Sequence, residues 1–197
     1  MTRWAAIVLA AGRSKRFGAA DKLAAELNGK TVLDHVLDSL ASAGLDQVIL
    51  VTGPEAAAVP EAVDHVVNAT PEAGMGVSLA TGMTALQSCD GVFIVLGDVP
   101  FVRAGLVVAM KERLSDHDIV VPMHDGQRGH PVLFGPACFD ALRQCRGDVG
   151  ARHVITSGLF RVAMYEDESA AGQMDVDTPE DLARLRGVAV RKGSSAD

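Results

Sequence analysis

Short runs of consecutive apolar residues alternate with longer segments in which apolar positions recur every three or four residues. Uninterrupted runs such as 5–11 and 91–96 are too short for a core-forming helix and are typical of parallel strands covered on both faces. The alternation predicts strands at 5–11, 47–52, 65–68, 91–96 and 119–122, and helices at 31–43, 75–86 and 103–114. Repeated strand-helix-strand units of this kind, joined by right-handed crossovers, predict a doubly wound α/β sheet.

The alternation of predicted strands and helices ends after residue 123. Turn residues at Asp125-Gly126 and Gly129 precede another apolar run, so 124–135 predicts an inserted hairpin or an extended excursion. We then expect helices at 136–143 and 152–157, a strand at 159–164, and a helix from Thr178 to Arg186 that begins with proline and two acids. The chain therefore predicts a single α/β domain over residues 1–190 with a mostly parallel sheet, and a frayed tail at 191–197.

Composition excludes several classes of protein. None of the apolar runs in the 197 residues approaches the roughly 20 that span a membrane, and no signal-peptide pattern opens the chain, so we expect a cytoplasmic protein with no membrane contact. A net charge of −7 argues against a nucleic-acid surface. Cys89, Cys138 and Cys145 lack the spacing of a zinc site or a disulfide framework, so we interpret them as small core or surface residues.

Positive charge is concentrated directly after the first predicted strand. Residues 11–22 hold Arg13, Lys15, Arg16 and Lys22 against the single acid Asp21. In an acidic chain such a focused field favours a bound polyanion, with phosphates as the obvious candidate, over a loop of solvated charges. Gly12 and Gly18 can adopt positive φ and bring backbone amides close to an oxyanion. The spacing matches neither the P-loop nor the dinucleotide fingerprint.

The run Leu9-Ala10-Ala11-Gly12-Arg13-Ser14-Lys15-Arg16-Phe17-Gly18, followed by Asp21-Lys22-Leu23, resembles the signature loop of the molybdenum cofactor nucleotidyltransferases. The resemblance extends over essentially 5–185 and implies a Rossmann-like nucleotidyltransferase fold. It implies that Leu9, Ala10, Ala11 and Gly12 bind the nucleotide, and that Arg16 and Lys22 stabilise the α-phosphate and the departing pyrophosphate. Ala10-Ala11-Gly12 stands where guanylyltransferases tend to have Ala-Gly-Gly, so the loop is more similar to the cytidylyltransferase branch.

Two carboxylates are candidate ligands for Mg²⁺ or Mn²⁺. Asp98 follows the most apolar strand, where a hard oxygen ligand beside a triphosphate suits such an ion, although aspartate near a proline also forms ordinary turns. The resemblance implies that Gly97-Asp98-Val99-Pro100 supplies the metal-binding aspartate. It also implies a second ligand before the Thr178-Pro179 helix start, Asp177 in preference to Asp175, unless Asp177 only begins that helix.

Three residues near the middle of the chain are candidates for the nucleotide pocket. The Asn68 amide can both donate to and accept from a base or ribose, and Gly74 and Gly76 permit close backbone approach, while Ser78 is equally a helix cap. The resemblance implies that Asn68, Gly76 and Ser78 bind the nucleotide.

Two residues of the second half are candidates for the other substrate. The resemblance implies that His130, in Gly129-His130-Pro131, belongs to the half of the fold that faces the second substrate. Asp148, in the Gly147–Gly150 segment, would orient that substrate or contribute to metal binding.

The resemblance as a whole implies Mg²⁺-dependent transfer of CMP from CTP to the phosphate of a molybdopterin cofactor, with release of pyrophosphate. A phosphate acceptor is already ionised near neutral pH, so no strong general base is needed. The alternatives are a guanylyl or other nucleotidyl transferase acting on another small phosphorylated acceptor, and a non-catalytic carrier that hands the cofactor to a molybdoenzyme. In either case we expect at most transient contact with an apoenzyme. A nicotinamide oxidoreductase is disfavoured because the dinucleotide fingerprint is missing.

Overall fold

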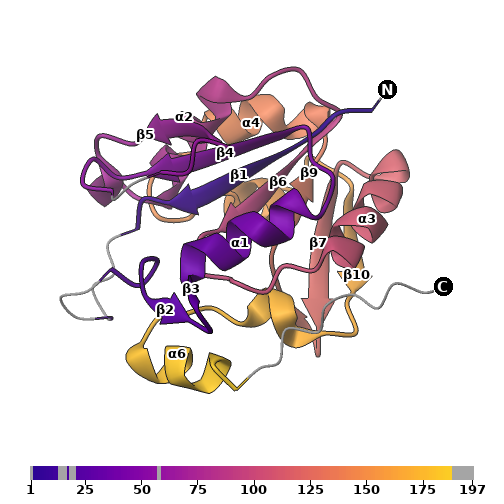
Figure 1. The fold of residues 1–197 in the computed structure, drawn as a ribbon. Coiled ribbons are helices and arrows are strands. Elements are labelled where there is room, and N and C mark those ends of the chain that lie inside the picture. Colours follow the sequence, from indigo (N-terminus) through magenta and orange to yellow (C-terminus); the bar gives the residue numbers. More distant parts are fainter. Residues whose placement is uncertain (1, 13–16, 18–20, 57–58, 188–197) are drawn as a thin grey trace.

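The computed structural model describes residues 2–12, 17, 21–56 and 59–187, and the expected tail at 191–197 lies outside these ranges. An eight-stranded, mostly parallel sheet forms its centre, in the order β10-β7-β9-β6-β1-β4-β5 with β8 paired to β7 (Figure 1). The strands are β1 (Trp4–Ala10), β4 (Gln47–Thr52), β5 (Asp64–Val67), β6 (Gly91–Leu96), β7 (Ile119–His124), β8 (Gln127–Arg128), β9 (Val132–Phe134) and β10 (Val162–Glu166). The predicted α/β fold class is confirmed.

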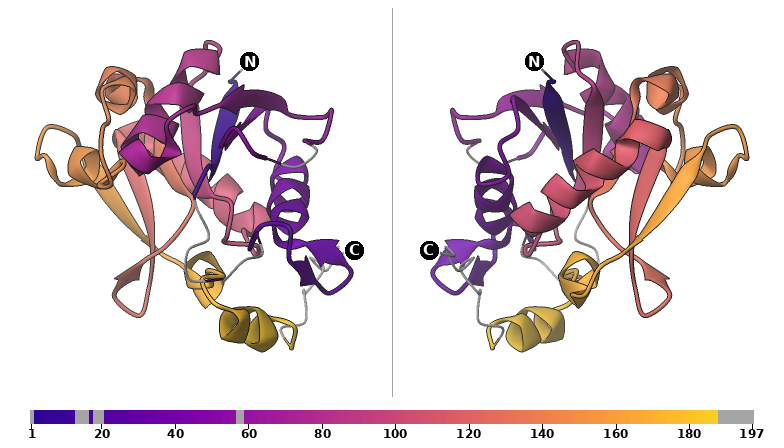
Figure 2. Two further views of the ribbon diagram at one scale, coloured as in Figure 1. Left: turned by 90° about the vertical axis from the view of Figure 1, so that its left-hand side faces the viewer. Right: turned by 90° about the vertical axis from the view of Figure 1, so that its right-hand side faces the viewer.

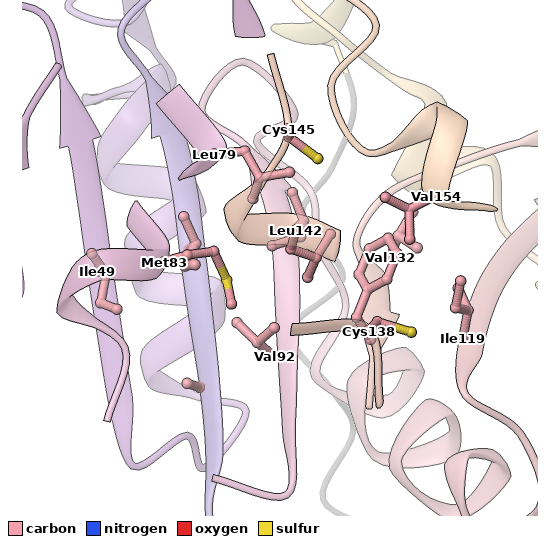
Figure 3. Packing of buried hydrophobic residues seen from close by; sticks show 14 of the residues in the cluster. Ile49, Leu79, Met83, Val92, Ile119, Val132, Cys138, Leu142, Cys145 and Val154 are labelled. Atoms are coloured by element: carbon pink, nitrogen blue, oxygen red, sulfur yellow. The ribbon is translucent and has the colours of Figure 1, made fainter. Parts of the chain in front are cut away.

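Helices cover both faces of this sheet, as Figure 2 shows. On one face α1 (Val32–Ala41) and α3 (Ala104–Arg113) pack against side chains such as Val8 and Phe93. On the other face lie α2 (Met75–Ala85), α4 (Phe139–Arg143) and α5 (Arg152–Thr156). Figure 3 shows this second core, in which Met83 of α2 and Leu142 of α4 meet strand residues. Neighbouring residues of a strand face opposite layers, which explains the uninterrupted apolar runs.

The predicted inserted hairpin occupies a more central place than its sequence suggests. β8 pairs antiparallel with β7, and the chain then returns to insert β9 antiparallel between β6 and β7. All three β9 residues are buried, with Leu133 facing one core and Val132 and Phe134 facing the other. The excursion therefore completes the sheet and brings the segment before β9 next to the carboxyl end of β6.

A third, smaller core lies at the carboxyl edge of the sheet. The short strands β2 (Glu26–Leu27) and β3 (Lys30–Thr31) form a hairpin, and α6 (Pro179–Leu185) lies beside it (Figure 1). The buried members of this core are Leu23, Leu27, Val32, Val176, Leu182 and Leu185. Residues separated by most of the chain thus meet here, next to the ends of the parallel strands.

Several element boundaries differ from the sequence expectation. The hairpin of β2 and β3 was not predicted, although its Asn28-Gly29 turn, with φ of 51° and 86°, is a known hairpin signal. β10 begins at Val162 because residues 157–159 form a turn in which Leu159 N donates to Ser157 Oγ. Short 3₁₀ helices, none of them predicted as such, occur at η1 (Pro71–Ala73), η2 (Leu114–Asp116), η3 (Pro136–Cys138) and η4 (Ala170–Gln173).

Two expectations from composition can be compared with the structure. Within the described ranges no helix is both long and apolar enough to cross a bilayer. Cys89, Cys138 and Cys145 are free thiols, as expected, and burial raises the pKa of Cys138 to about 12, so this thiol stays protonated at neutral pH.

Candidate functional site: a lysine held between two carboxylates

Three segments converge at the carboxyl edge of the sheet. Lys22 precedes β2, Asp98 follows β6, and Asp177 lies immediately before α6. The backbone N–H of Val176 donates to the carbonyl oxygen of Asp98 at 2.9 Å, which pairs the two carboxylate-bearing segments directly. In open α/β sheets ligands bind at this edge, where loops after the strands come together.

Lys22 joins the two predicted metal ligands. Its Nζ donates to Asp98 Oδ2 at 2.5 Å and to Asp177 Oδ1 at 2.9 Å, and the Lys22 side chain is only 14% exposed. Burial by itself would lower the pKa of Lys22, but the charges and hydrogen bonds of Asp98 and Asp177 outweigh it, so the pKa is raised. The ammonium therefore stays charged and acts as the counterion of both carboxylates.

The third core explains why these side chains meet. Leu23, next to Lys22, and Val176, next to Asp177, are both buried in it. The cap of α6 is Thr178, whose hydroxyl accepts from Asp181 N while Asp181 reaches back to Thr178 N. This capping box starts the helix without using the Asp177 carboxylate as the cap. Apolar burial on either side of the site thus directs both polar side chains to the same place.

Asp98 and Asp177 suit a divalent cation whose remaining ligands are water and phosphate oxygens. Asp98 Oδ1 is buried and has no hydrogen-bond partner among the described residues, so one oxygen of this carboxylate has unused acceptor capacity. The described ranges contain no group of three or more metal-binding side chains. Two carboxylates without histidine or cysteine suit Mg²⁺ or Mn²⁺, which retain waters and substrate oxygens in their coordination shell.

Asp175 adds to the negative charge of this region. Burial raises its pKa, and repulsion from Asp177 and Asp98 raises it further. Lys22 contacts Asp177 directly, so the lysine favours Asp177 over Asp175 as the second metal ligand. A cation at this place would relieve the mutual repulsion of the carboxylates.

The candidate nucleotide loop begins beside Asp98. The carbonyl oxygen of Leu9 accepts from Gly97 N at 3.0 Å, and a Cβ at Gly97 would approach Ala10 at 3.3 Å, so the two loops are in contact. Ala11 is buried, whereas Gly12 is exposed and a Cβ there would meet no described atom within 4 Å. Gly12 does not use the positive φ that glycine permits. Arg16, together with Arg13, Lys15 and Gly18, lies outside the described residues.

Asn68, Gly76 and Ser78 lie together at the start of α2, but their polar groups bond within the protein. Asn68 Nδ2 donates to Ser78 Oγ at 2.9 Å, and Asn68 Oδ1 accepts from Thr70 N. Gly76 N donates to Gly147 O at 2.7 Å. Ser78 is not the helix cap, a position that Gly74 occupies.

The two glycines of this segment serve packing. A Cβ at Gly74 would lie 2.3 Å from the carbonyl carbon of Gly147, and one at Gly76 would lie 2.7 Å from the Arg146 backbone. Residues 146–148 thus fill the space on the Cβ side of both glycines, and the expected contact of Gly76 with the nucleotide stays a prediction. Asp148 lies in this same turn and is exposed.

His130 lies on the other side of the β6 end, in a cavity shared with Leu96, Val99 and Asp175. Burial lowers the pKa of His130, while a backbone hydrogen bond with Ile94 and the charge of Asp98 act in the opposite direction. The histidine is therefore close enough to Asp98 to sense its charge.

Two further contacts were not indicated by any sequence motif. The guanidinium of Arg103, at the start of α3, forms an ion pair with the buried carboxylate of Asp167, directly after β10. Gly172 approaches the backbone of His130 closely. Both contacts join segments distant in sequence, and neither belongs to a local motif that could have indicated it.

Comparison with known proteins identifies the family. The profile of the MobA-like NTP transferase domain matches residues 6–163. The chain belongs to this family. The MobA-like match includes the loop after β1, Asp98 and His130, and it stops before Asp177.

Curated relatives have several names. Purine catabolism protein PucB of Bacillus subtilis (strain 168) is 29% identical over 91% of this chain and 94% of the relative. Nicotine blue oxidoreductase of Paenarthrobacter nicotinovorans is 26% identical over 91% and 94%. A probable molybdenum cofactor guanylyltransferase of Natronomonas pharaonis is 27% identical over 91% and 95%.

A solved structure agrees with the fold over nearly the whole chain. Rv0371c from Mycobacterium tuberculosis H37Rv superimposes with a TM-score of 0.84 at 31% identity, covering 93% of this chain and 97% of that one. A second crystal structure of Rv0371c, with a TM-score of 0.79 and 29% identity over 93% and 98%, is a complex with manganese. This MobA-like chain is thus a nucleotidyltransferase-family protein whose relative binds a divalent cation of the kind that Asp98 and Asp177 suit.

Proposed function

We propose that this MobA-like protein transfers CMP from CTP to the phosphate of a molybdopterin cofactor and releases pyrophosphate, with Mg²⁺ or Mn²⁺ as the metal. The observation that carries the proposal is the contact of Lys22 with both Asp98 and Asp177 at the carboxyl edge of the sheet. A cation for phosphates and two oxygen ligands for a metal are the parts that phosphoryl chemistry requires. The protein would act in the cytoplasm, where nucleoside triphosphates are made.

In the proposed reaction an oxygen of the acceptor phosphate attacks the α-phosphorus of CTP in line. A new bond forms between these two atoms, the bond from the α-phosphorus to the bridging oxygen breaks, and pyrophosphate leaves. No proton needs to be removed, because the phosphate oxygen is already ionised near neutral pH. The protein therefore contributes positioning and charge.

The residues divide these tasks between them. Lys22, charged because its pKa is raised, would stabilise the negative charge that builds up on the α-phosphate and pyrophosphate, together with Arg16. Gly12, exposed and without a side chain, would let the β- and γ-phosphates approach its amide. Asp98 and Asp177 would hold the metal, which neutralises phosphate charge when bound. Leu9, Ala10 and Ala11 would position the nucleotide through the loop that Gly97 anchors to β6.

We assign the pocket for the base to the segment from Asn68 to the start of α2. Asn68 Nδ2 donates a hydrogen bond to Ser78 Oγ. We propose that this hydrogen bond shapes the pocket for the base and that Gly76 fixes the start of α2. The choice of CTP rests on the similarity of Ala10-Ala11-Gly12 to the loop of the cytidylyltransferase branch. The guanylyltransferase name of one relative favours GTP as the second candidate donor.

The test is a comparison of CTP, GTP, ATP and UTP as donors with molybdopterin-bound molybdenum as acceptor and Mg²⁺ present, with pyrophosphate release as the readout. We expect release with CTP, and we expect Asp98→Ala to abolish it. Release with GTP alone would replace the cytidylyl assignment by the guanylyl one. Binding of nucleotide and cofactor without any pyrophosphate would instead support a carrier that delivers the cofactor to an apoenzyme.

A further inference from the structure

An ion pair between Arg103 and Asp167 joins two segments of the chain that both lead to the proposed metal ligands. Arg103 ends the loop that carries Asp98 and is the N-cap residue of α3. Asp167 follows β10 directly, and the chain continues from it through η4 to Asp177. The two paired residues are 64 positions apart, so the tertiary fold brings them together.

Asp167 is anchored at the carboxyl end of β7. Its backbone N–H donates to Met123 O at 2.7 Å, and its carbonyl oxygen accepts from His124 Nδ1 at 2.8 Å. Its carboxylate oxygen Oδ1 accepts from Ser169 N at 3.3 Å and from the guanidinium of Arg103. The carboxylate therefore has one fixed position at the edge of the sheet, and the start of α3 is held against it.

The burial of this ion pair indicates more than a gain in stability. The Asp167 side chain is only 3% exposed, and its Oδ2 has no hydrogen-bond partner among the residues that the structure describes. Burying a carboxylate is costly, and a buried ion pair often stabilises a protein no better than packed apolar residues would. A role in fixing how two segments align explains such a pair better than stability does.

The same two segments are linked a second time, next to the metal ligands. Val176 N donates to Asp98 O at 2.9 Å, and Asp177 follows Val176. The loop from Asp98 to Arg103 and the segment from Asp167 to Asp177 are thus joined near both of their ends. Two segments can pivot about a single hydrogen bond, whereas a second link at the other end prevents this.

The contacts between these two links have other partners. Gly172 O accepts from His130 N at 2.8 Å, and Gln173 Nε2 donates to carbonyl oxygens of the β7–β8 hairpin at 2.9 and 2.7 Å. These contacts tie η4 to the hairpin and to the segment before β9. Arg103 adds a link from η4's neighbouring chain to the loop that bears Asp98, which these contacts do not provide.

We propose that Arg103 and Asp167 are positioning residues of the metal site. Their ion pair keeps the segment that ends in Asp177 aligned with Asp98, so that both carboxylates reach one divalent cation. The inference rests on the proposed function and adds the contact that sets the distance between its two metal ligands. Metal affinity depends on ligands held in place by residues that do not themselves bind the metal.

The loss of Arg103 affects charge and position in opposite directions. Removing a positive charge near two carboxylates raises their affinity for a cation by Coulomb attraction. Loosening the segment that carries Asp177 lowers this affinity. The sign of the change in Mn²⁺ affinity therefore separates a positioning role from an electrostatic one.

The experiment compares four variants of the full chain. Arg103→Met removes the charge, and Arg103→Met/Asp167→Asn also removes the buried charge that the single variant leaves unpaired, which protects its folding. Arg103→Lys keeps a cation at this position. Arg161→Met is the matched control, because Arg161 pairs with Asp118 at 3.2 Å at the opposite ends of the same two strands, β10 and β7.

Mn²⁺ affinity is measured without nucleotide by electron paramagnetic resonance of the unbound ion, and thermal melting verifies that each variant is folded. Pyrophosphate release is then measured as a function of Mn²⁺ concentration, which separates the half-saturating concentration from the maximal rate. The first measurement depends on neither the donor nor the acceptor.

We expect Arg103→Met and the double variant to bind Mn²⁺ about tenfold more weakly. The half-saturating Mn²⁺ concentration should rise by the same factor, while the maximal rate changes less. Arg103→Lys should bind Mn²⁺ more tightly than Arg103→Met, although its charge alone would act in the opposite direction. Arg161→Met should bind Mn²⁺ like the unmodified protein even if its melting temperature falls.

Unchanged or tighter Mn²⁺ binding in the folded double variant would overturn the inference, as would equal weakening in Arg161→Met. If the unmodified protein binds no Mn²⁺, the metal site of the proposed function is itself wrong. If the variants weaken Mn²⁺ binding as expected but no nucleotide yields pyrophosphate, the positioning role stands and the proposed reaction fails.

Discussion

The ammonium of Lys22 lies 2.5 Å from Asp98 Oδ2, although the two residues are 76 positions apart in the chain. The same ammonium contacts Asp177, 155 positions away, so one cation joins three segments. Because the contact is largely shielded from solvent, the attraction is stronger than at an exposed surface. Lys22 thereby offsets part of the negative charge of the carboxylates that we assign to the metal, and a divalent cation has to compete with it.

The first prediction concerns Lys22→Met, which keeps the length of the side chain and removes its charge. Turnover should fall by about 10²- to 10³-fold, since a charge that acts on the transition state is lost. Binding of Mn²⁺ in the absence of nucleotide should become tighter, because Asp98 and Asp177 lose their competing cation. Electron paramagnetic resonance of unbound Mn²⁺ measures this affinity directly.

Lys30→Met is the matched control, because Lys30 forms an equally short but exposed ion pair with Asp38. It should change neither turnover nor Mn²⁺ affinity, as exposed pairs contribute little. Weaker Mn²⁺ binding in Lys22→Met would show that the lysine supports the metal site rather than competing with the metal.

A second prediction concerns the packing of α2 on the sheet. A Cβ at Gly82 would lie 2.6 Å from Ile7 Cγ2 and 2.9 Å from Val51 Cγ2, so Gly82→Ala overfills the core shown in Figure 3. We expect the free energy of unfolding to fall by about 1–3 kcal/mol. Gly105→Ala, in α3, meets no described atom within 4 Å and should instead stabilise by about 0.5–1 kcal/mol. Urea unfolding of both variants measures the difference, and equal effects would refute the packing argument.

A third prediction follows from the raised pKa of Asp175. A carboxyl whose folded-state pKa exceeds its unfolded value of about 3.8 binds protons more tightly in the folded protein, so its ionisation above that pH opposes folding. Asp175→Asn should therefore stabilise the metal-free protein at pH 7, but only by about a few tenths of a kcal/mol, because solvent screens the exposed Asp175 carboxylate. The gain should shrink as the pH falls below the folded-state pKa toward 3.8. Thermal unfolding across this pH range in the presence of EDTA checks the sign, and destabilisation at pH 7 would contradict it.

The sequence predicted the parts of the fold that local pattern determines. The strands at 47–52 and 91–96 agree with β4 and β6 residue for residue, because burial on both faces produces uninterrupted apolar runs. The position of β9 inside the sheet could not be predicted, since its three apolar residues are compatible with an edge, a hairpin or a central strand. Strand order depends on contacts between distant segments, which no local pattern records.

The candidate site likewise has residues whose role the sequence predicted and residues whose role it could not predict. Lys22, Asp98 and Asp177 could be selected by motif, and the sheet rule placed the first two at one edge. The role of Gly74 and Gly76 could not be predicted, because the sequence does not distinguish a glycine that packs against the backbone of residues 146–148 from one that a ligand contacts. Nor could the contact between His130 N and Gly172 O, because these two residues are distant in sequence.

The most direct test is the anomalous scattering of Mn²⁺ in crystals grown with a non-hydrolysable CTP analogue. We expect a single strong peak within about 2.0–2.6 Å of carboxylate oxygens of both Asp98 and Asp177 and of a phosphate oxygen. Lys22 Nζ should then have left the carboxylates for the α-phosphate. A manganese peak distant from Asp98, or a triphosphate that contacts neither Lys22 nor the metal, would contradict the proposed site.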